Sequence, residues 1–130
     1  MEDTVKIMDD LYYTESHEWV KVDKDTAYIG ITDFAQHELG DIVYVELPEV
    51  GDNIAAGEAF GSVEAVKAVE DIIAPISGEV LAINTELEDS PDLINRSPFE
   101  DGWLLKVKIS SQEEIENLLS AVEYKDIVEA

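Results

Sequence analysis

The chain has 130 residues, which suits a single domain, and 45% of them are hydrophobic, enough for a packed core. Its 31 acidic residues against 8 basic ones give a net charge of −23, which makes nucleic acids and anionic membranes poor partners. Cysteine is absent, which excludes disulfides, thiol catalysis and cysteine metal sites. The sequence contains no run of 18 apolar residues, the length needed to cross a membrane. We therefore expect a soluble, cytoplasmic and monomeric protein.

The first third of the chain predicts an arm followed by strands. Residues 1–11 have weak periodicity and lack the features of a signal or transit peptide, so we expect a flexible N-terminal arm. Residues 12–22 are rich in β-favouring side chains and begin a strand pair. Residues 26–32 alternate cleanly, with one face made of Ala27, Ile29 and Ile31.

A short helix and another strand follow. Thr32-Asp33 is predicted to start the helix, residues 34–39 are expected to make one or two turns, and Gly40 is expected to end it. The strand is predicted over residues 41–47, with one face made of Val43, Val45 and Leu47 and the other of Ile42, Tyr44 and Glu46.

Residues 59–75 are predicted to form a central hairpin. Valines and isoleucines favour extended chain on both sides of Lys67, the only lysine or arginine between Lys24 and Arg96. If Val66 and Lys67 are the central turn residues, Lys67 stands alone at the tip, and the facing pairs are Ala65 with Ala68 and Glu64 with Val69. This pattern fits a solubilising lysine, and it also fits a point of covalent attachment.

The second half of the chain predicts fewer elements. A strand is expected at residues 80–83, and residues 84–102 form a looser connection with a helical turn at 91–94. The last strand is predicted over residues 103–109, with one face made of Trp103, Leu105, Val107 and Ile109.

The C-terminal segment, residues 111–128, is predicted to be helical. Ser111 with Glu114 is a capping-box pattern, and it is expected to open a helix whose apolar stripe is Ile115, Leu118, Leu119 and Val122. Residues 124–128 are expected to continue as a second short helix.

Short alternating strands followed by a terminal helical segment are typical of an all-β sandwich or flattened barrel. We expect residues 12–130 to form a single domain. Six of its side chains are predicted to lie in the core, namely Ile29, Ile31, Val43, Val45, Ile83 and Leu105.

No conventional active site emerges from the sequence. The Ser-His-Glu run at residues 16–18 cannot act as a catalytic triad, because neighbouring residues on a strand face opposite sides. His17 and His37 lack the spacing of a zinc hydrolase, and His37 is expected on the surface of a short helix. No lysine–serine pair of a phosphate loop follows the glycines Gly51, Gly57 and Gly61.

The run Glu-Ala-Val-Lys-Ala at residues 64–68 resembles the lipoyl-attachment region of glycine cleavage system H proteins, which usually have serine where this chain has Ala65. Further motifs of this family stand in order along residues 12–128. They are Ser-His-Glu-Trp-Val at 16–20, Gly-Ile-Thr-Asp at 30–33, Leu-Gly-Asp at 39–41, Val-Tyr-Val-Glu-Leu-Pro-Glu-Val-Gly at 43–51, and Ser-Pro-Phe-Glu-Asp-Gly-Trp at 97–103.

The resemblance implies an all-β dominated fold, a lipoyl/biotinyl-domain-like hybrid of barrel and sandwich with short helices and a C-terminal helix. It implies that Lys67 holds lipoate in amide linkage, and that Glu64 and Ala68 are recognised by the attaching enzyme, a lipoate ligase or a lipoyl/octanoyl transferase. The loaded arm is expected to lie in a surface cleft where Glu18 and Asp71 meet its amine, with Ser16 nearby.

The resemblance also implies a carrier and not an enzyme. Such a carrier takes the aminomethyl group of glycine from the pyridoxal-phosphate-dependent glycine decarboxylase (P protein) to the folate-dependent aminomethyltransferase (T protein). Dihydrolipoyl dehydrogenase (L protein) then reoxidises it. The location is cytoplasmic as in bacteria, or the mitochondrial matrix where a transit peptide has been removed.

Other carriers of the same fold remain as alternatives. Biotinyl domains have methionine on both sides of the lysine, where this chain has Val66 and Ala68. Lipoyl domains of 2-oxo acid dehydrogenases usually have aspartate before the lysine and lack the Ser-His-Glu-Trp strand. An H-like protein could also relay lipoate to those domains, or serve as a non-lipoylated structural homologue.

Overall fold

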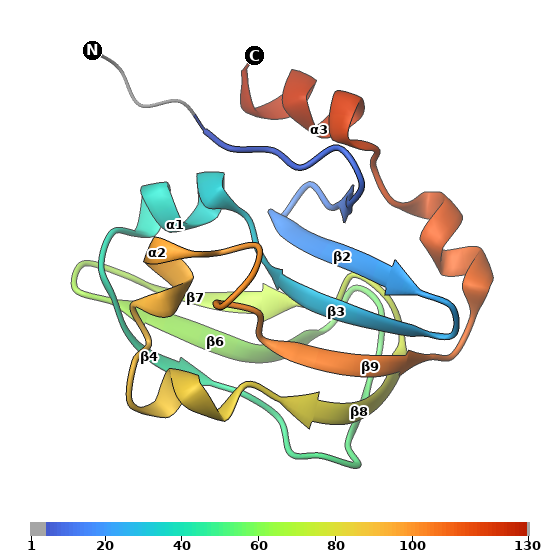
Figure 1. Ribbon diagram of the computed structural model, residues 1–130, viewed down its shortest axis with the longest axis horizontal. Coiled ribbons are helices and arrows are strands. Elements are labelled where there is room, and N and C mark those ends of the chain that lie inside the picture. The colour runs from blue at the N-terminus through green and yellow to red at the C-terminus, as the bar shows by residue number, and fades with distance from the viewer. Residues whose placement is uncertain (1–4, 130) are drawn as a thin grey trace.

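The computed structural model describes residues 5–129 (Figure 1). Its strands are β1 (Tyr12–Tyr13), β2 (Glu18–Asp23), β3 (Thr26–Ile31), β4 (Ile42–Glu46), β5 (Asn53–Ile54), β6 (Ala59–Ala65), β7 (Val69–Ile73), β8 (Gly78–Ile83) and β9 (Leu105–Ile109). Its helical segments are α1 (Asp33–Leu39), η1 (Thr85–Glu88), α2 (Leu93–Arg96), η2 (Gln112–Asn117) and α3 (Ala121–Val128).

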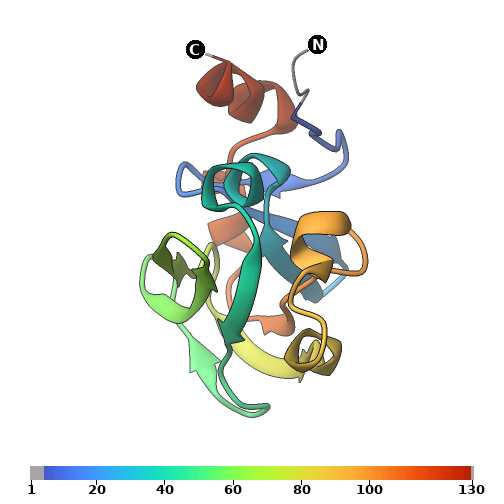
Figure 2. The same cartoon turned by 90° about the vertical axis from the view of Figure 1, so that its left-hand side faces the viewer.

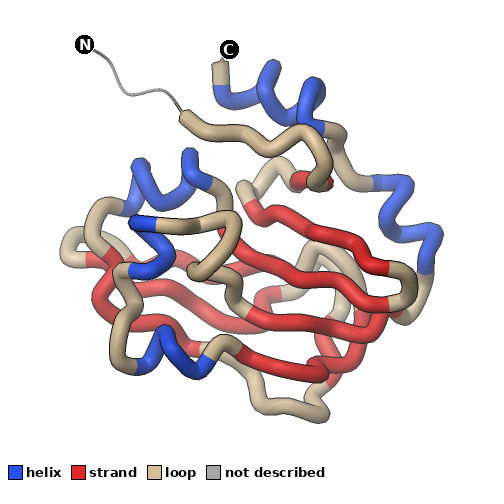
Figure 3. Tube along the Cα trace, viewed as in Figure 1, coloured by secondary structure: helices blue, strands red, loops and turns tan. Residues whose placement is uncertain are grey.

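The strands form two sheets that do not close into one barrel. A six-stranded sheet has the order β1-β2-β3-β9-β8-β5, and a three-stranded sheet has the order β4-β6-β7. The helices lie around the edges of the strands (Figure 3). This mostly β architecture with short helices confirms the predicted hybrid of barrel and sandwich.

The main hydrophobic core draws on strands of both sheets. Ile29 and Leu105 of the larger sheet are fully buried, and Val63 and Ile72 of the smaller sheet are buried with them in the same cluster. In β3, the residues that the sequence placed on one face, Ala27, Ile29 and Ile31, are all buried, because side chains alternate between the two faces of a strand.

A second hydrophobic cluster joins the two ends of the described chain. Tyr13 and Tyr124 are fully buried in it, and Ile7 and Met8 of the N-terminal segment pack against it. The N-terminal segment and α3 lie side by side at one end of the molecule (Figures 1 and 2). A flexible arm was expected at residues 1–11, and residues 1–4 of it lie outside the described residues.

The predicted alternation of the strand at residues 41–47 is wrong in part. Val43 is 52% exposed, whereas its neighbour Ile42 is 2% exposed. The register with β6 shifts between Ile42 and Tyr44, which marks a bulge, and a bulge breaks the period of two. Val45 and Ile83, which were predicted to be inside, are half-buried and pack against the core.

The predicted capping box at Ser111 is also wrong. Ser111 makes no side-chain cap bond, and the Glu114 carboxylate accepts hydrogen bonds from the backbone N–H and the hydroxyl of Ser77, at 2.7 and 2.9 Å, in place of the Ser111 backbone. The capping box forms instead between Ser120 and Glu123, where α3 begins. Residues 112–117 form a short 3-10 segment, and Val122 of the predicted apolar stripe is 72% exposed.

The α1 helix agrees with the sequence prediction. The α1 helix spans Asp33–Leu39, which agrees with the predicted start at Thr32-Asp33, and the Thr32 hydroxyl accepts from the backbone N–H of Ala35. Gly40 has a φ of 84° and ends the helix, which suits a residue without a Cβ. Among residues 5–129, no helix combines the length and hydropathy that crossing a membrane requires.

Candidate functional site

Lys67 stands at the tip of the β6–β7 hairpin. The backbone N–H of Ala65 donates to the carbonyl of Ala68 at 2.7 Å, and Glu64 pairs with Val69, as the sequence predicted. Lys67 is exposed, and no described carboxylate forms an ion pair with it. Its amine therefore projects into solvent from a rigid two-residue turn.

Strand β4 holds the hairpin in place. The backbone N–H of Val66 donates to the carbonyl of Asp41 at 3.1 Å, which ties the turn to the start of β4. At the other end of β6, Gly61 lies so close to the carbonyl of Glu46 that a Cβ would clash with it. The lysine is therefore presented by a supported sheet and not by a loose loop.

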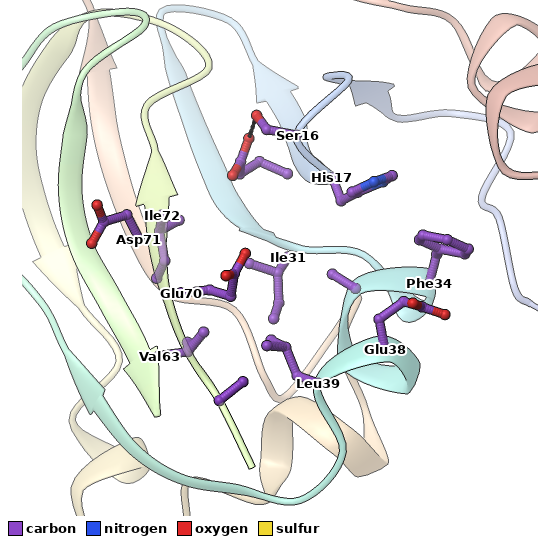
Figure 4. A pocket seen from close by; sticks show the side chains of 13 residues that line it. Ser16, His17, Ile31, Phe34, Glu38, Leu39, Val63, Glu70, Asp71 and Ile72 are labelled. Atoms are coloured by element: carbon purple, nitrogen blue, oxygen red, sulfur yellow. Dashed lines mark hydrogen bonds between the residues drawn. The ribbon is translucent and has the colours of Figure 1, made fainter. Parts of the chain in front are cut away.

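A cleft of about 370 Å³ opens beside the hairpin, on the side that faces α1 (Figure 4). One wall comes from the hairpin and the other from α1, and the segment that begins β2 lies at one end. The residues that line it are Ser16, His17, Glu18, Ile31, Phe34, Ala35, Glu38, Leu39, Val63, Ala68, Glu70, Asp71 and Ile72. Ala68 belongs both to this lining and to the turn that carries Lys67.

Glu18 is the buried carboxylate of the cleft, with 2% of its surface exposed. Its Oε1 accepts hydrogen bonds from the hydroxyls of Thr14 and Ser16, each at 2.6 Å, and its Oε2 accepts from the backbone N–H of Ile73 at 3.2 Å. Burial raises the pKa of Glu18 above its ordinary value, and these hydrogen bonds act in the opposite direction. The site thus contains an acid that a nearby cation would stabilise in its charged form.

The predicted cleft residues are brought together only in part. The Ser16 hydroxyl donates a hydrogen bond to Glu18, whereas Asp71 is exposed and lies opposite Ser62 in the β6–β7 strand pair. Figure 4 shows the Asp71 carboxylate pointing away from Ser16, to the other side of the strand from Glu70. Asp71 therefore lies at the margin of the cleft.

Sequence reasoning missed Glu70, whose side chain points toward the cleft in Figure 4. Glu70 pairs with Val63, which is buried, and paired residues of antiparallel strands lie on the same face. The signal was present in the sequence, because the predicted pairing of Glu64 with Val69 already sets Val63 opposite Glu70.

His17 also lines the cleft, in a conformation that few residues adopt. Its φ is 74°, and its Nδ1 lies 2.9 Å from the hydroxyl of Tyr124. Its ring packs against that of Phe34 on α1, with the ring centroids 4.7 Å apart. Burial lowers the pKa of His17, so the imidazole is neutral near pH 7. His37, in contrast, is an exposed residue of α1, as expected from the sequence.

Among residues 5–129, no group of three or more His, Cys, Asp or Glu residues is placed to bind a metal ion. The hybrid fold, the lone lysine at a hairpin tip and the adjoining cleft define a carrier domain of the lipoyl and biotinyl class.

Comparison with known proteins specifies the family. The Glycine cleavage H-protein family matches residues 11–130. The glycine cleavage system H protein of Bacillus licheniformis is 57% identical over 119 residues, which cover 92% of this chain and 94% of the relative. That of Staphylococcus carnosus is 53% identical over 122 residues, covering 94% and 97%. A crystal structure of a glycine cleavage system H protein from Mycobacterium marinum superposes with a TM-score of 0.89 at 38% identity, covering 95% of this chain and 100% of that one.

The chain belongs to the glycine cleavage H-protein family. Its function is therefore that of a lipoate-dependent carrier in glycine cleavage, which favours this interpretation over lipoyl relay and over a 2-oxo acid dehydrogenase domain. Members of this family are carriers that work with the other enzymes of the glycine cleavage system.

Proposed function

We propose that Lys67 is the lipoylated residue, with lipoate joined to its Nζ by an amide bond. The observation that carries this proposal is the position of Lys67 at the tip of a supported hairpin whose next residue, Ala68, lines the cleft. Amide formation removes the charge of the lysine, and no described ion pair is lost in the process. When bound, lipoate supplies the dithiolane that accepts the aminomethyl cargo and becomes reduced.

The residues around Lys67 are available to an attaching enzyme. Glu64 and Ala68 are both exposed, and Val66 beside the lysine is 69% exposed. A lipoate ligase or a lipoyl/octanoyl transferase could therefore read the acid three residues before the lysine and the small residue after it. Where the family usually has serine, this chain has Ala65. The missing hydroxyl does not affect recognition by the attaching enzyme, because Ala65 is buried.

The cleft is proposed to shelter the aminomethyl cargo between partners. An amine that carries a charge needs a paired hydrogen-bonding partner when it leaves water. Glu18 supplies a buried carboxylate that Ser16 holds in place, and Asp71 adds a second negative charge at the margin. Ile31, Leu39 and Ile72 supply apolar surface for the carbon chain of the arm. The residues present thus fit the group.

The partners follow from the cargo. We propose that the chain receives the aminomethyl group at glycine decarboxylase and delivers it to the folate-dependent aminomethyltransferase. Dihydrolipoyl dehydrogenase would then restore the disulfide. The net charge of −23 supports a monomer in the cytoplasm that docks on basic faces of these enzymes.

The test is the intact mass of the protein purified from its own host, together with Lys67→Arg. The parent should carry one lipoyl group, and Lys67→Arg should fold but carry none and support no glycine cleavage. Lys21→Arg is the matched control, since Lys21 is an exposed lysine on β2, and it should be modified as the parent is. Lipoate on Lys67→Arg, or a parent without lipoate, would contradict the proposal.

A further inference from the structure

The hydroxyl of Tyr124 connects the C-terminal helix to the α1 wall of the cleft and to the segment that begins β2. It lies 2.9 Å from Nδ1 of His17 and 2.7 Å from the hydroxyl of Thr32. Tyr124 is fully buried, and its ring stacks on that of Tyr13 with centroids 4.6 Å apart and planes 8° from parallel. Helix α3 lies at the end of the molecule and outside the cleft, so this contact acts at a distance from the hairpin (Figure 1).

Each of the two partners of Tyr124 positions one side of the cleft. Thr32 is the N-cap of α1, and its hydroxyl accepts from the backbone N–H of Ala35 at 3.2 Å. His17 precedes Glu18 and is held at a positive φ. The backbone N–H of Thr32 donates to the carbonyl of His17 at 3.0 Å, so the two positions are also joined through the main chain.

One hydroxyl can satisfy both partners in two ways. If Tyr124 donates to Nδ1 of His17, the Thr32 hydroxyl donates to Tyr124. If Nδ1–H of His17 donates to Tyr124, Tyr124 donates to Thr32. Both arrangements require the tyrosine to keep its proton, and burial raises the pKa of Tyr124 to about 12. Without this hydroxyl, a partly buried imidazole and a buried threonine would both lose a partner.

We propose that Tyr124 is a positioning residue for the cleft: its hydroxyl sets the places of His17 and of the N-terminus of α1, and so makes α3 part of the machinery that shelters the cargo. This inference rests on the proposed function of the cleft. It assigns to the C-terminal helix a role that no residue of the hairpin can perform, because the helix acts on the wall opposite Lys67.

Tyr124→Phe tests the proposal, with Tyr13→Phe as its matched control. Both variants delete one hydroxyl from the same stacked and fully buried pair. Among residues 5–129, however, the Tyr13 hydroxyl bonds only to the backbone of Met8, at 2.8 Å. Two measurements are made: the ¹⁵N chemical shifts of the His17 ring in unlipoylated protein, and ammonia release from the loaded protein after removal of the decarboxylase.

Tyr124→Phe should shift the Nδ1 signal of His17 and raise the rate of ammonia release roughly threefold to tenfold, the effect of one lost hydrogen bond. Tyr13→Phe should leave both at parental values. The proposal is overturned if Tyr124→Phe releases ammonia at the parental rate, or if both variants change equally. Should Tyr124→Phe not fold, His17→Gln breaks the same bond from the cleft side and is judged by the same release rate. A parent that cannot be loaded would instead refute the proposed function, and this inference with it.

Discussion

Ala65 and Ala68 close the hairpin through a single hydrogen bond of 2.7 Å, from the amide of the first to the carbonyl of the second. This bond places Lys67 in solvent while Ala68 lines the cleft. Lys67 is therefore adjacent in the chain to a residue that lines the cleft, so an arm on Lys67, as proposed above, needs no domain movement to reach it.

Removing the charge of a cleft acid is expected to expose the cargo. Glu18→Gln and Asp71→Asn should leave lipoylation intact but speed ammonia release from the loaded protein. The loss of a hydrogen bond to a charged group corresponds to about tenfold to a hundredfold for the buried Glu18. Asp71→Asn should have the smaller effect, because Asp71 is exposed and its carboxylate points away from Ser16.

The control for these variants is Glu79→Gln, an exposed acid on β8 outside the cleft. It should behave as the parent does. If Glu18→Gln and Asp71→Asn also release ammonia at the parental rate, neither carboxylate shelters the cargo.

Truncation of buried core residues should separate the true core from the bulged strand. Ile29→Ala and Leu105→Ala should each lower the free energy of unfolding by about 2–5 kcal/mol, because both side chains are fully buried. Val43→Ala should change it by no more than about 0.5 kcal/mol, as at other exposed positions. Urea unfolding measures all three. A large loss for Val43→Ala would mean that Val43 belongs to the core, as the alternation predicts.

The two Ser-x-x-Glu patterns of the C-terminal segment should differ in their contribution to stability. Ser120→Ala removes the N-cap of α3 and should cost about 0.5–2 kcal/mol of unfolding free energy. Ser111→Ala is the control, since the Ser111 side chain makes no cap bond, and should cost almost nothing. Equal losses in thermal unfolding of the two variants would contradict this assignment of the cap.

The buried Glu18 should make the free energy of unfolding depend on pH. Its folded pKa is raised above the ordinary value of 4.5, so the folded state binds this proton more tightly than the unfolded state does. The contribution of Glu18 to the unfolding free energy should therefore be greatest below pH 4.5 and fall as the pH rises through the raised pKa.

The variant Glu18→Gln lacks this contribution, and the difference between parent and variant isolates it from other groups. His17 acts in the opposite sense, because its lowered pKa makes stability rise as the pH approaches 6.5 from below. Urea unfolding of unlipoylated parent and variant across this range is the measurement. Parallel pH profiles would show that the pKa of Glu18 is not raised.

Local patterns were sufficient to predict the elements on which the carrier function depends. The hairpin could be predicted because strand pairing around a two-residue turn is set by neighbours in sequence, and the lone Lys67 marked its tip. The α1 helix could be predicted because its cap, Thr32, and its end, Gly40, lie within the helix's own segment.

Contacts between distant segments decided the rest. The Ser111 and Ser120 patterns are equivalent in sequence, but only the second forms a capping box, while Glu114 of the first bonds to the distant Ser77. Glu18 is one of 31 acids in the sequence, and only the fold buries it, where its carboxylate accepts a hydrogen bond from the distant backbone N–H of Ile73. Hydrophobic periodicity reports which face of an element is buried, but it carries no information on which other element covers that face. The sequence therefore determined the hairpin and its exposed Lys67, and the tertiary structure determined which side chains line the cleft beside it.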